Sequence, residues 1–519
     1  MEGIIERLVM VLLVGAVVRA TWIAVYRLFF HPLANIPGPF LARMTWLYST
    51  WFNIVRGRFY IHIQELHEKY GSYNDSQISP YGSFLICPGP IIRITPNEIH
   101  LSNPDNCEKI HFVGSRFIKD PGFYGAFGID KSIFTTVNPE VHRVKRAALN
   151  PFFSRKRVLD LEAIVQHKAQ KLITRMKTAF ASGSGIDVHH GFRAISIDAI
   201  TDYAFDNCYN FLDKEDFGVE WFNDFRDMGP AIWFFQQFPS IQQVALCVPY
   251  WLAKLLSGPL ARMMFQHMSS RAQIVRVKDA IDRGEKSSRS TIFHELLRPD
   301  AAEGYTVPTV DELSDESHNL LGAAADTTGN ALNTAAYNIV TNPGVYARIA
   351  AELRDTFPDP DAPIDYVTLE KLPYLTATIK EALRLCFAVP GRIPRVVPAS
   401  GAYFEGQYVP PGTVVSMSSW MMHHDKNLFP DADKFSPERW LDPARAKLLE
   451  KNLFSFGKGS RQCVGMPLAY CELYVTLGRI FRTFDNLKTR VKSREEMLYD
   501  DYFSAYHPEK HNKFIFELA

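Results

Sequence analysis

Cys463 stands in the segment whose residue types are best suited to chemistry, Phe456-Gly457-Lys458-Gly459-Ser460-Arg461-Gln462-Cys463-Val464-Gly465. Its two glycines, two residues apart, predict a tight turn with positive φ before the cysteine. Gly465 removes a side chain that would obstruct a flat ligand. Met466-Pro467 then predicts the start of an apolar helix over residues 468–481. The positive end of that helix and Arg461 should lower the pKa of the Cys463 thiol, so we expect a thiolate and not an inert buried cysteine.

A long helix is predicted over residues 311–340, and polar residues lie among small ones at its centre. Thr309 and Glu312 fit a capping box at its start. The centre reads Gly322-Ala323-Ala324-Ala325-Asp326-Thr327-Thr328-Gly329. Small side chains leave a flat face, whereas Asp and Thr are poor interior helix formers because they compete for backbone hydrogen bonds. Alone, the segment fits close helix packing as well as a bulky group lying against the backbone.

Glu381 and Arg384 lie three residues apart on a second helix, predicted from Tyr374 to Phe387 after Pro373. This spacing puts both side chains on one helix face, within reach of an ion pair. Without a further partner, such a pair usually lies on the surface and contributes little to stability.

The remaining elements are predominantly helical. Apolar residues recur with the period of a helix through most long segments, for example over residues 157–180. Strand-like runs are short: residues 84–87, 91–94, 396–397, 408–409 and 413–415. We therefore expect a mainly α fold with small β-sheets.

Composition excludes several classes of protein. The 519 residues are 47% hydrophobic and 22% charged, which is typical of a globular chain and not of a disordered one. The net charge of +1 offers no field to attract nucleic acid, so no nucleic-acid partner is expected. The seven cysteines include no C-x-x-C pair, which argues against a disulfide framework or a zinc knuckle and favours a reducing compartment.

The N-terminus carries an apolar run, residues 8–30, interrupted only by Arg19 and Arg27. Its 23 helical residues would rise about 34 Å, enough to cross a bilayer core of about 30 Å. We expect a retained membrane anchor over residues 1–30; an interfacial helix, because of Arg19, and a buried core helix are the alternatives. Glu2 and Glu6, and the lack of a cleavage site, disfavour targeting peptides. Arginines after the run orient the bulk of the chain to the cytosol.

Two segments read as linkers. Residues 31–39, His-Pro-Leu-Ala-Asn-Ile-Pro-Gly-Pro, predict a stiff, extended, proline-rich hinge. Residues 284–309 are polar and predict an interior loop region with one short helical turn. The domain organisation expected is therefore an anchor at 1–30, a hinge at 31–39 and a catalytic domain at 40–519.

Residues 456–465 resemble the haem-binding loop of the cytochrome P450 superfamily, Phe-Gly-x-Gly-x-Arg-x-Cys-x-Gly, with every fixed position matched. Residues 381–384 look like the Glu-x-x-Arg helix of that family, 437–440 like its partner segment, and 323–328 like its oxygen-activation segment. The N-terminal anchor and proline hinge are similar to those of microsomal members. The resemblance covers essentially all 519 residues.

This resemblance implies haem b as cofactor, with the Cys463 thiolate as axial iron ligand. Phe456 and Gly465 belong to the matched loop. The implied partners of the haem propionates are His142, Arg146, Arg395 and Arg461, with Arg392 as an alternative to Arg395. Glu381, Arg384 and Arg439 would form a buried structural triad.

The resemblance further implies that Asp326 and Thr327 manage protons for oxygen chemistry, the hydroxyl holding oxygen and a water while the carboxylate relays protons. The substrate pocket should be apolar, and family position suggests the following lining residues: Phe123, Tyr124, Phe127, Ala323, Val389, Ile393 and Phe503. Aromatic residues between Trp221 and Trp251 could roof that pocket and reach a membrane surface, or pack in the core.

Two positions depart from the family pattern. Ala324 replaces the usual glycine of the oxygen-activation segment, which narrows its groove by one methyl group. His142 replaces the usual tryptophan of an early helix, and its ring can still donate a hydrogen bond to a propionate. Residues 119–124 and 150–154 are similar to fungal secondary-metabolism members of the trichodiene-oxygenase type.

The activity implied is oxygen insertion from O2 into a lipophilic small molecule, such as a terpenoid or polyketide-type intermediate. Electrons would come from NADPH through a cytochrome P450 reductase. The implied location is a single-pass membrane protein of the endoplasmic reticulum with a cytosolic catalytic domain. A haem-thiolate isomerase or dehydratase, which needs no reductase, and a non-catalytic haem protein are the alternatives, since neither must keep the Asp326-Thr327 pair.

Overall fold

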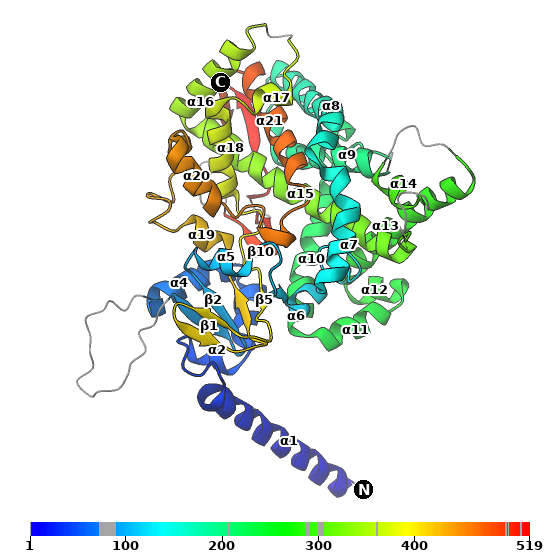
Figure 1. Cartoon of the computed structure of the whole chain (residues 1–519). Helices are drawn as coiled ribbons and strands as arrows, with labels where there is room; N and C mark the ends of the chain where they lie inside the picture. The colour runs from blue at the N-terminus through cyan, green and yellow to red at the C-terminus, as the bar shows by residue number, and fades with distance from the viewer. Residues whose placement is uncertain are drawn as a thin grey trace, which may run out of the picture. The chain divides into compact units, whose positions relative to one another are not determined.

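The computed structural model describes residues 2–71, 90–205, 207–285, 291–298, 306–359, 362–491, 493, 496, 498–508 and 511–519. The described chain is mainly helical with small β-sheets, which confirms the predicted fold class (Figure 1). It divides into two compact units, one formed by Met1–Asp120 with Gly391–Met422 and the other by Pro121–Pro390 with His423–Ala519.

The first unit is built on a five-stranded sheet with the strand order β1-β2-β8-β5-β3. β1 and β2 are antiparallel, whereas β2 and β8 are parallel. Helix α4 packs its apolar face on β1, with Phe59, Ile63 and Leu66 against Ile92 and Ile94. The strands of this unit are β1 (Ile91–Thr95), β2 (Glu98–Leu101), β3 (Ile118–Lys119), β5 (Arg395–Val396), β8 (Val414–Ser416) and the hairpin β6 (Ala402–Phe404) with β7 (Gln407–Val409). Its helices are α1 (Glu2–Val25), η1 (Tyr26–Phe30), α2 (Phe40–Met44), α3 (Leu47–Thr50), η2 (Trp51–Val55), α4 (Phe59–Gly71) and α5 (Asn106–Ile110), and α19 (Ser419–His423) ends it.

The N-terminal apolar run is one continuous helical stretch, α1 followed by the π-helical turn η1. Residues 4–30 are long and apolar enough to cross a membrane, and none of the most apolar window is buried in the protein. Exposure on all sides excludes the buried core helix that the sequence had left open. The helix is therefore a candidate membrane anchor.

The proline-rich segment that follows is folded against the sheet. As expected it is not helical, but residues 31–36 form turns where we predicted an extended chain, and Leu33 and Ile36 are buried. Arg93 of β1 holds it, because its Nη1 donates to Arg27 O at 2.9 Å and to Leu33 O at 3.2 Å. Gly38 is required here, since a Cβ at this position would lie 2.1 Å from Arg93 O. The segment is thus an anchored turn.

The second unit is a helical bundle around the long helix α15, which packs on α9, α13, α18 and α21 (Figure 1). Its larger helices are α7 (Pro139–Leu149), α8 (Arg155–Ala181), α9 (Val188–Phe205), α10 (Val219–Gln237), α11 (Pro239–Cys247), α13 (Gly258–Asp282), α15 (Val310–Thr341), α16 (Pro343–Thr356), α18 (Pro373–Cys386), α20 (Pro443–Asn452) and α21 (Met466–Thr483). Its shorter helices are α6 (Pro121–Gly125), η3 (Asn150–Phe153), η4 (Phe211–Asp213), α12 (Tyr250–Leu256), α14 (Ile292–Leu296), α17 (Tyr366–Leu369), η5 (Pro437–Trp440) and η6 (Gly459–Arg461). A three-stranded sheet has the order β4 (Ile186–Asp187), β12 (Ile515–Leu518), β9 (Leu487–Thr489), and β10 (Asp500–Tyr502) pairs with β11 (Ser504–Tyr506).

The helices predicted from the sequence are confirmed. Helix α15 begins with the expected capping box, in which Thr309 and Glu312 each satisfy the other's backbone N–H. The predicted strand at residues 84–87 lies outside the described residues. Of the polar stretch 284–309, the described part includes the short helix α14. The expected strands at 91–94, 396–397, 408–409 and 413–415 appear as β1, β5, β7 and β8, with boundaries shifted by at most one residue.

Candidate active site

Cys463 lies in a loop whose backbone is fixed by hydrogen bonds. Gly457 and Gly459 have φ of +63° and +67°, as their spacing predicted. The Cys463 N–H donates to Phe456 O at 2.9 Å, and the Phe456 ring packs at 5.3 Å from the Tyr470 ring of α21. The loop therefore presents Cys463 in one conformation, directly before α21.

The Cys463 thiol is solvent-accessible, yet protein atoms surround it closely enough to raise its pKa. It therefore faces a recess of the protein and not the open surface. Backbone N–H groups of Gly465 and Met466 act in the opposite direction and lower the pKa, as does the charge of Arg146. Our expectation of a net lowered pKa was wrong, because burial outweighs the helix N-terminus when no cation binds the sulfur.

The cation beside the cysteine also differs from the expectation. Arg461 points to the loop before α7, where it donates to Thr136 O at 2.6 Å and Val137 O at 2.9 Å. Arg146 of α7 instead donates to Gln462 O, next to Cys463. His142 is buried one turn earlier on the same helix. Two of the predicted propionate partners, His142 and Arg146, thus lie on α7, and a third, Arg461, lies against the loop that leads into it.

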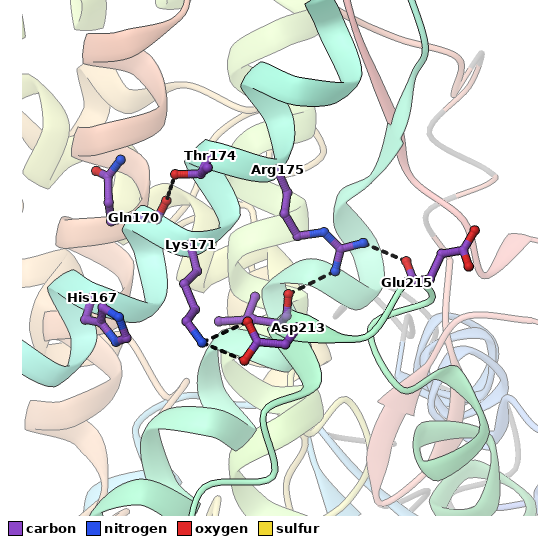
Figure 2. A pocket seen from close by; sticks show the side chains of 8 residues that line it. His167, Gln170, Lys171, Thr174, Arg175, Asp213 and Glu215 are labelled. Atoms are coloured by element: carbon purple, nitrogen blue, oxygen red, sulfur yellow. Dashed lines mark hydrogen bonds and ion pairs between the residues drawn. The ribbon is translucent and has the colours of Figure 1, made fainter. Parts of the chain in front are cut away.

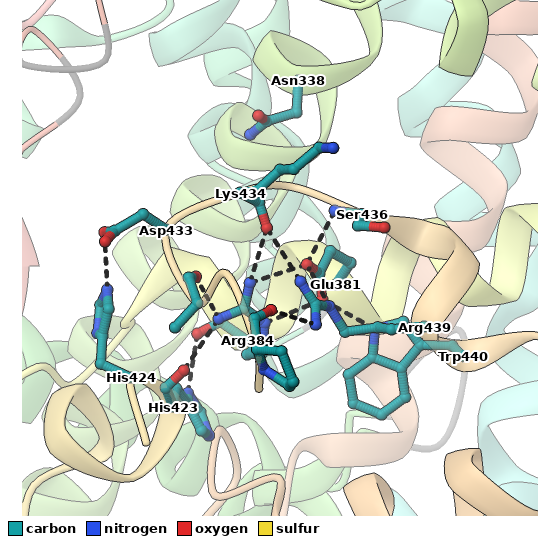
Figure 3. Close-up of polar contacts among 12 residues, drawn as sticks. Asn338, Glu381, Arg384, His423, His424, Asp433, Lys434, Ser436, Arg439 and Trp440 are labelled. Atoms are coloured by element: carbon teal, nitrogen blue, oxygen red, sulfur yellow. Dashed lines mark hydrogen bonds and ion pairs between the residues drawn. The ribbon is translucent and has the colours of Figure 1, made fainter. Parts of the chain in front are cut away.

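Glu381 and Arg384 form the predicted buried pair, and Arg439 joins them (Figure 3). The Arg384 guanidinium donates to both Glu381 oxygens, at 2.9 and 2.8 Å. Glu381 also accepts from Arg439 Nε at 3.0 Å and from Trp440 Nε1 at 2.9 Å. Because Glu381 and Arg384 have no exposed surface, these bonds replace the water that both charges lose.

His423, which the sequence reasoning missed, belongs to the same network (Figure 3). Its Nδ1 lies 2.8 Å from Arg384 O, and its Nε2 lies 2.9 Å from the N–H of Phe454. Burial, with the nearby Arg384 charge, lowers the pKa of His423 to about 3. The imidazole is therefore neutral near neutral pH. No spacing motif marks it, since its partners are 39 and 31 residues away.

Asp326 and Thr327 point to different partners at the centre of α15. Asp326 is buried and pairs with Arg193 Nε of α9 at 2.7 Å. Arg193 is held in turn by Asn330 Oδ1 at 2.6 Å and His189 O at 3.1 Å. The Thr327 hydroxyl donates to Ala323 O of the preceding turn at 2.8 Å. Arg193 was also missed, since 133 residues separate it from Asp326.

Aromatic rings bring several of the predicted pocket residues together. Phe503 lies at the tip of the β10–β11 hairpin, with a φ of +73°. Its ring centroid is 6.2 Å from Phe123, 5.2 Å from Phe127 and 5.0 Å from Phe134. Tyr124 contacts Phe123 and Phe134. We call these residues, Phe123, Tyr124, Phe127, Phe134 and Phe503, the aromatic cluster.

The remaining predicted site residues divide between the two units. Arg395 and Ile393 belong to the first unit, where Arg395 is buried and donates to Pro394 O at 2.9 Å. Arg392, the alternative to Arg395, is ion-paired with buried Glu98 at 2.9 Å. Val389 belongs to the second unit.

Figure 2 shows a pocket on α8 and the loop after α9, whose lining side chains are charged or polar except for Leu212. Lys171 contacts both carboxylate oxygens of Asp213, at 2.8 and 2.7 Å. Arg175 donates to Leu212 O at 3.0 Å and Glu215 O at 2.6 Å. These cations tie the loop to the helix, which is a structural role.

Comparison with known proteins identifies the fold that carries this loop. The family model described as "Cytochrome P450" matches residues 39–516. This chain belongs to the cytochrome P450 family. Relatives of this P450 include the cytochrome P450 monooxygenase MO6277 of Ascocoryne sarcoides, 34% identical over 93% of this chain and 93% of the relative. The monooxygenase tpcC of Cochliobolus heterostrophus is 33% identical (94% and 90% covered), and the tryptophan 6-hydroxylase fscE of Fusarium equiseti is 32% identical (93% and 92%).

Membership of the family, with monooxygenases among the relatives, makes this P450 a haem-thiolate monooxygenase. Members of the family use haem b with a cysteine thiolate on the iron and electrons supplied by a reductase. The family assignment from the sequence is thus confirmed, whereas the narrower resemblance to trichodiene oxygenase stays a prediction.

The residues of this P450 fit a haem. A Cβ at Gly465 would lie 3.9 Å from Cys463 Sγ and meet no other atom within 4 Å, so the space beside the sulfur is kept free of side chains. On α15, a mostly buried helix, Ala323 is exposed and Ala324 and Thr327 are half-exposed. A soft anionic ligand and a small-residue helix face are what a planar iron macrocycle requires.

Proposed function

We propose that this P450 inserts oxygen from O2 into a lipophilic small molecule of fungal secondary metabolism, of the terpenoid or polyketide type. The observation that carries this proposal is the fixed, recessed thiol of Cys463, in a chain related to fungal monooxygenases over most of its length. Bound haem would supply the oxygen chemistry, and the protein supplies the ligand, the orientation and the exclusion of water.

We propose a ligand set for the haem. Cys463 would bind the iron, and Phe456 and Gly465 would shape the loop around the sulfur. His142, Arg146, Arg395 and Arg461 are the proposed partners of the two propionates. Arg146 and Arg461 each already donate to backbone carbonyls, so their guanidinium groups are held in place before a carboxylate arrives. Preorganised cations reduce the cost of burying two negative charges.

Proton handling is assigned to Thr327 and Asp326. The Thr327 hydroxyl donates to Ala323 O in this structure, and with haem bound it would turn to donate to the reacting oxygen. Asp326 can pass protons inward only when Arg193 loosens its contact with one carboxylate oxygen. The ion pair thereby keeps this carboxylate oriented between turnovers.

The aromatic cluster supports an apolar substrate. Its five rings contribute Tyr124 Oη as the one polar side-chain atom. Ala323, Val389 and Ile393 are the further proposed lining residues. A pocket of this chemistry favours molecules with planar or branched hydrocarbon surface over charged ones.

We propose the domain organisation expected from the sequence, with residues 1–30 as anchor, 31–39 as the connecting segment and 40–519 as catalytic domain. The exposed apolar helix Ile4–Phe30 supports single-pass anchoring, in the endoplasmic reticulum with the catalytic domain in the cytosol. Exposed apolar side chains of α11 and α12, among them Val244, Trp251 and Leu255, support a second lipid contact. NADPH–cytochrome P450 reductase is the proposed electron donor.

The test is the spectrum of the reduced protein with carbon monoxide. Wild-type protein should give the long-wavelength absorption band that marks thiolate-ligated haem, and Cys463→Ser should abolish it. Survival of the band in that variant would place the iron ligand elsewhere and overturn the assignment. Product formation that needs NADPH and a reductase separates a monooxygenase from an isomerase or dehydratase.

A further inference from the structure

His423 ends helix α19 and uses both nitrogens of its buried ring. Arg384 O can only accept a hydrogen bond, so His423 Nδ1 must carry the proton toward it. The N–H of Phe454 can only donate, so Nε2 must accept. The two partners together allow a single neutral tautomer.

The two partners belong to different parts of the site. Arg384 lies in the last turn of α18, where carbonyl groups have no partner within the helix. Phe454 is where the chain enters the loop that ends at Cys463. A direct bond runs beside this bridge, from Ser455 Oγ to Leu383 O at 2.7 Å. Two links, the His423 bridge and this direct bond, thus join the C-terminal end of α18 to the start of the loop.

Hydrogen bonds within the loop couple the position of Phe454 to that of Cys463. Phe454 O accepts from Gly457 N at 2.9 Å, and Phe456 O accepts from Cys463 N at 2.9 Å. These bonds leave little freedom between the first and the last residue of the loop. A displacement of Phe454 therefore displaces the Cys463 sulfur.

We propose that His423 is a positioning residue for Cys463, a neutral hydrogen-bond bridge that fixes the thiolate loop against the C-terminal end of α18. The proposal rests on the proposed role of Cys463 as haem ligand. His423 acts through the loop and touches no reacting atom. The groups facing its ring are Arg384, His424, Phe387 and Phe429. The positive charge of Arg384, together with burial, keeps the imidazole neutral.

The chain offers a matched control in the next residue. His424 is a histidine of the same turn, 3.4 Å from exposed Asp433 and stacked on Phe387, whereas the bonds to Arg384 O and to the N–H of Phe454 come from His423 (Figure 3). His423→Phe keeps a ring of similar volume and removes both bonds. His423→Gln returns a donor and an acceptor from one amide group.

The experiment measures two properties of each holoprotein. The first is the fraction of the ferrous carbon monoxide complex that has the thiolate band. The second is hydrogen exchange in peptides covering residues 452–463. We expect His423→Phe to lose most of the thiolate form and to exchange about tenfold faster at Phe454, the effect of one lost hydrogen bond. His423→Gln should restore both properties in large part, and His424→Gln should match the wild type.

A wild-type spectrum and exchange rate in His423→Phe would overturn the proposal, as would an equal effect of His424→Gln. Should His423→Phe fail to fold, Ser455→Ala decides, because it removes the parallel bond without changing the core. A measurable shift in the same direction supports the bridge, and unchanged exchange refutes it. A wild-type protein without a thiolate band would instead refute the proposed function itself.

Discussion

The Glu381 network at the C-terminal end of α18 and the aromatic cluster at the β10–β11 hairpin are stabilised by different kinds of interaction. In the first, charges without exposed surface are matched by directional bonds, and Glu381 alone accepts from Arg384, Arg439 and Trp440. In the second, rings meet edge to face, and the most central ring, Phe503, sits on a backbone with positive φ.

The two kinds of interaction differ in how much movement of the side chains they allow. Bonds between buried charges have one good geometry, so they fix the C-terminal half of α18 against the segment that carries Arg439 and Trp440. Edge-to-face contacts between rings tolerate rotation and small shifts, so a pocket built from them can accept varied apolar molecules. We therefore expect substitutions in the Glu381 network to affect stability and those in the aromatic cluster to affect the choice of product.

The largest effect is expected for Arg384→Leu. It leaves buried Glu381 with one arginine fewer, and breaking a buried pair in this way typically costs about 3–5 kcal/mol. Urea denaturation of the purified protein measures this loss. The control is Arg143→Leu on α7, whose ion pair with Glu140 is exposed and should contribute less than about 1 kcal/mol. If the free energy of unfolding fell as little as in the control, the network would not be important for the stability of the fold.

Thr327→Ala should uncouple the reaction and leave the fold intact. Loss of a placed donor at developing negative charge typically costs about 2.7–4 kcal/mol of transition-state stabilisation. The Thr327 hydroxyl bonds only to its own helix among the described contacts, and Ala is the better helix former, so unfolding should change little. NADPH consumed, hydrogen peroxide released and product formed are measured together. An unchanged ratio of product to NADPH would assign proton delivery to another group.

Glu472 of α21 gives a prediction about pH. It is buried, accepts from Ser196 Oγ at 2.5 Å, and its pKa is raised from 4.5 to about 7 because burial disfavours the charged form. The folded state thus holds a proton that the unfolded state has released, so stability should fall by about 3 kcal/mol as pH rises from about 4.5 to 7. Glu472→Gln should remove this decline. His423, whose pKa is lowered in the folded state, instead makes stability fall as pH decreases. The quantity to compare is therefore the difference in unfolding free energy between Glu472→Gln and the wild type at each pH.

Phe503→Gly should change the choice of product more than it changes stability. The substitution loses three ring contacts worth about 0.5–1.5 kcal/mol each, and the relief of left-handed strain of about 1–2 kcal/mol offsets only part of that loss. The melting temperature should therefore fall modestly, while the affinity for an apolar ligand and the product pattern change. A strongly lowered melting temperature with an unchanged product pattern would make the aromatic cluster part of the core.

The sequence predicted those features that lie close together along the chain. The Gly-rich turn, the capping box of α15 and the Glu381–Arg384 pair each span a few residues, so local patterns describe them fully. Arg193 and His423 could not be found in this way, because folding alone brings them to Asp326 and Phe454. The pKa of Cys463 was predicted in the wrong direction for a related reason. Helix termini and neighbouring charges can be read from a sequence, but burial is a property of the assembled fold.

Arg93 fixes the end of the N-terminal helix to the five-stranded sheet. Its guanidinium bonds to Arg27 O and Leu33 O, on both sides of the end of the helix, and to Pro96 O within its own sheet. The helix Ile4–Phe30 therefore leaves the first unit in a fixed direction, as a rigid arm of about 40 Å. As a membrane anchor, an arm of this length would tilt within a bilayer core of about 30 Å or project from it. A thinner bilayer would then tilt the arm further and turn the five-stranded sheet with it, so bilayer thickness would set the angle at which this unit meets the membrane surface.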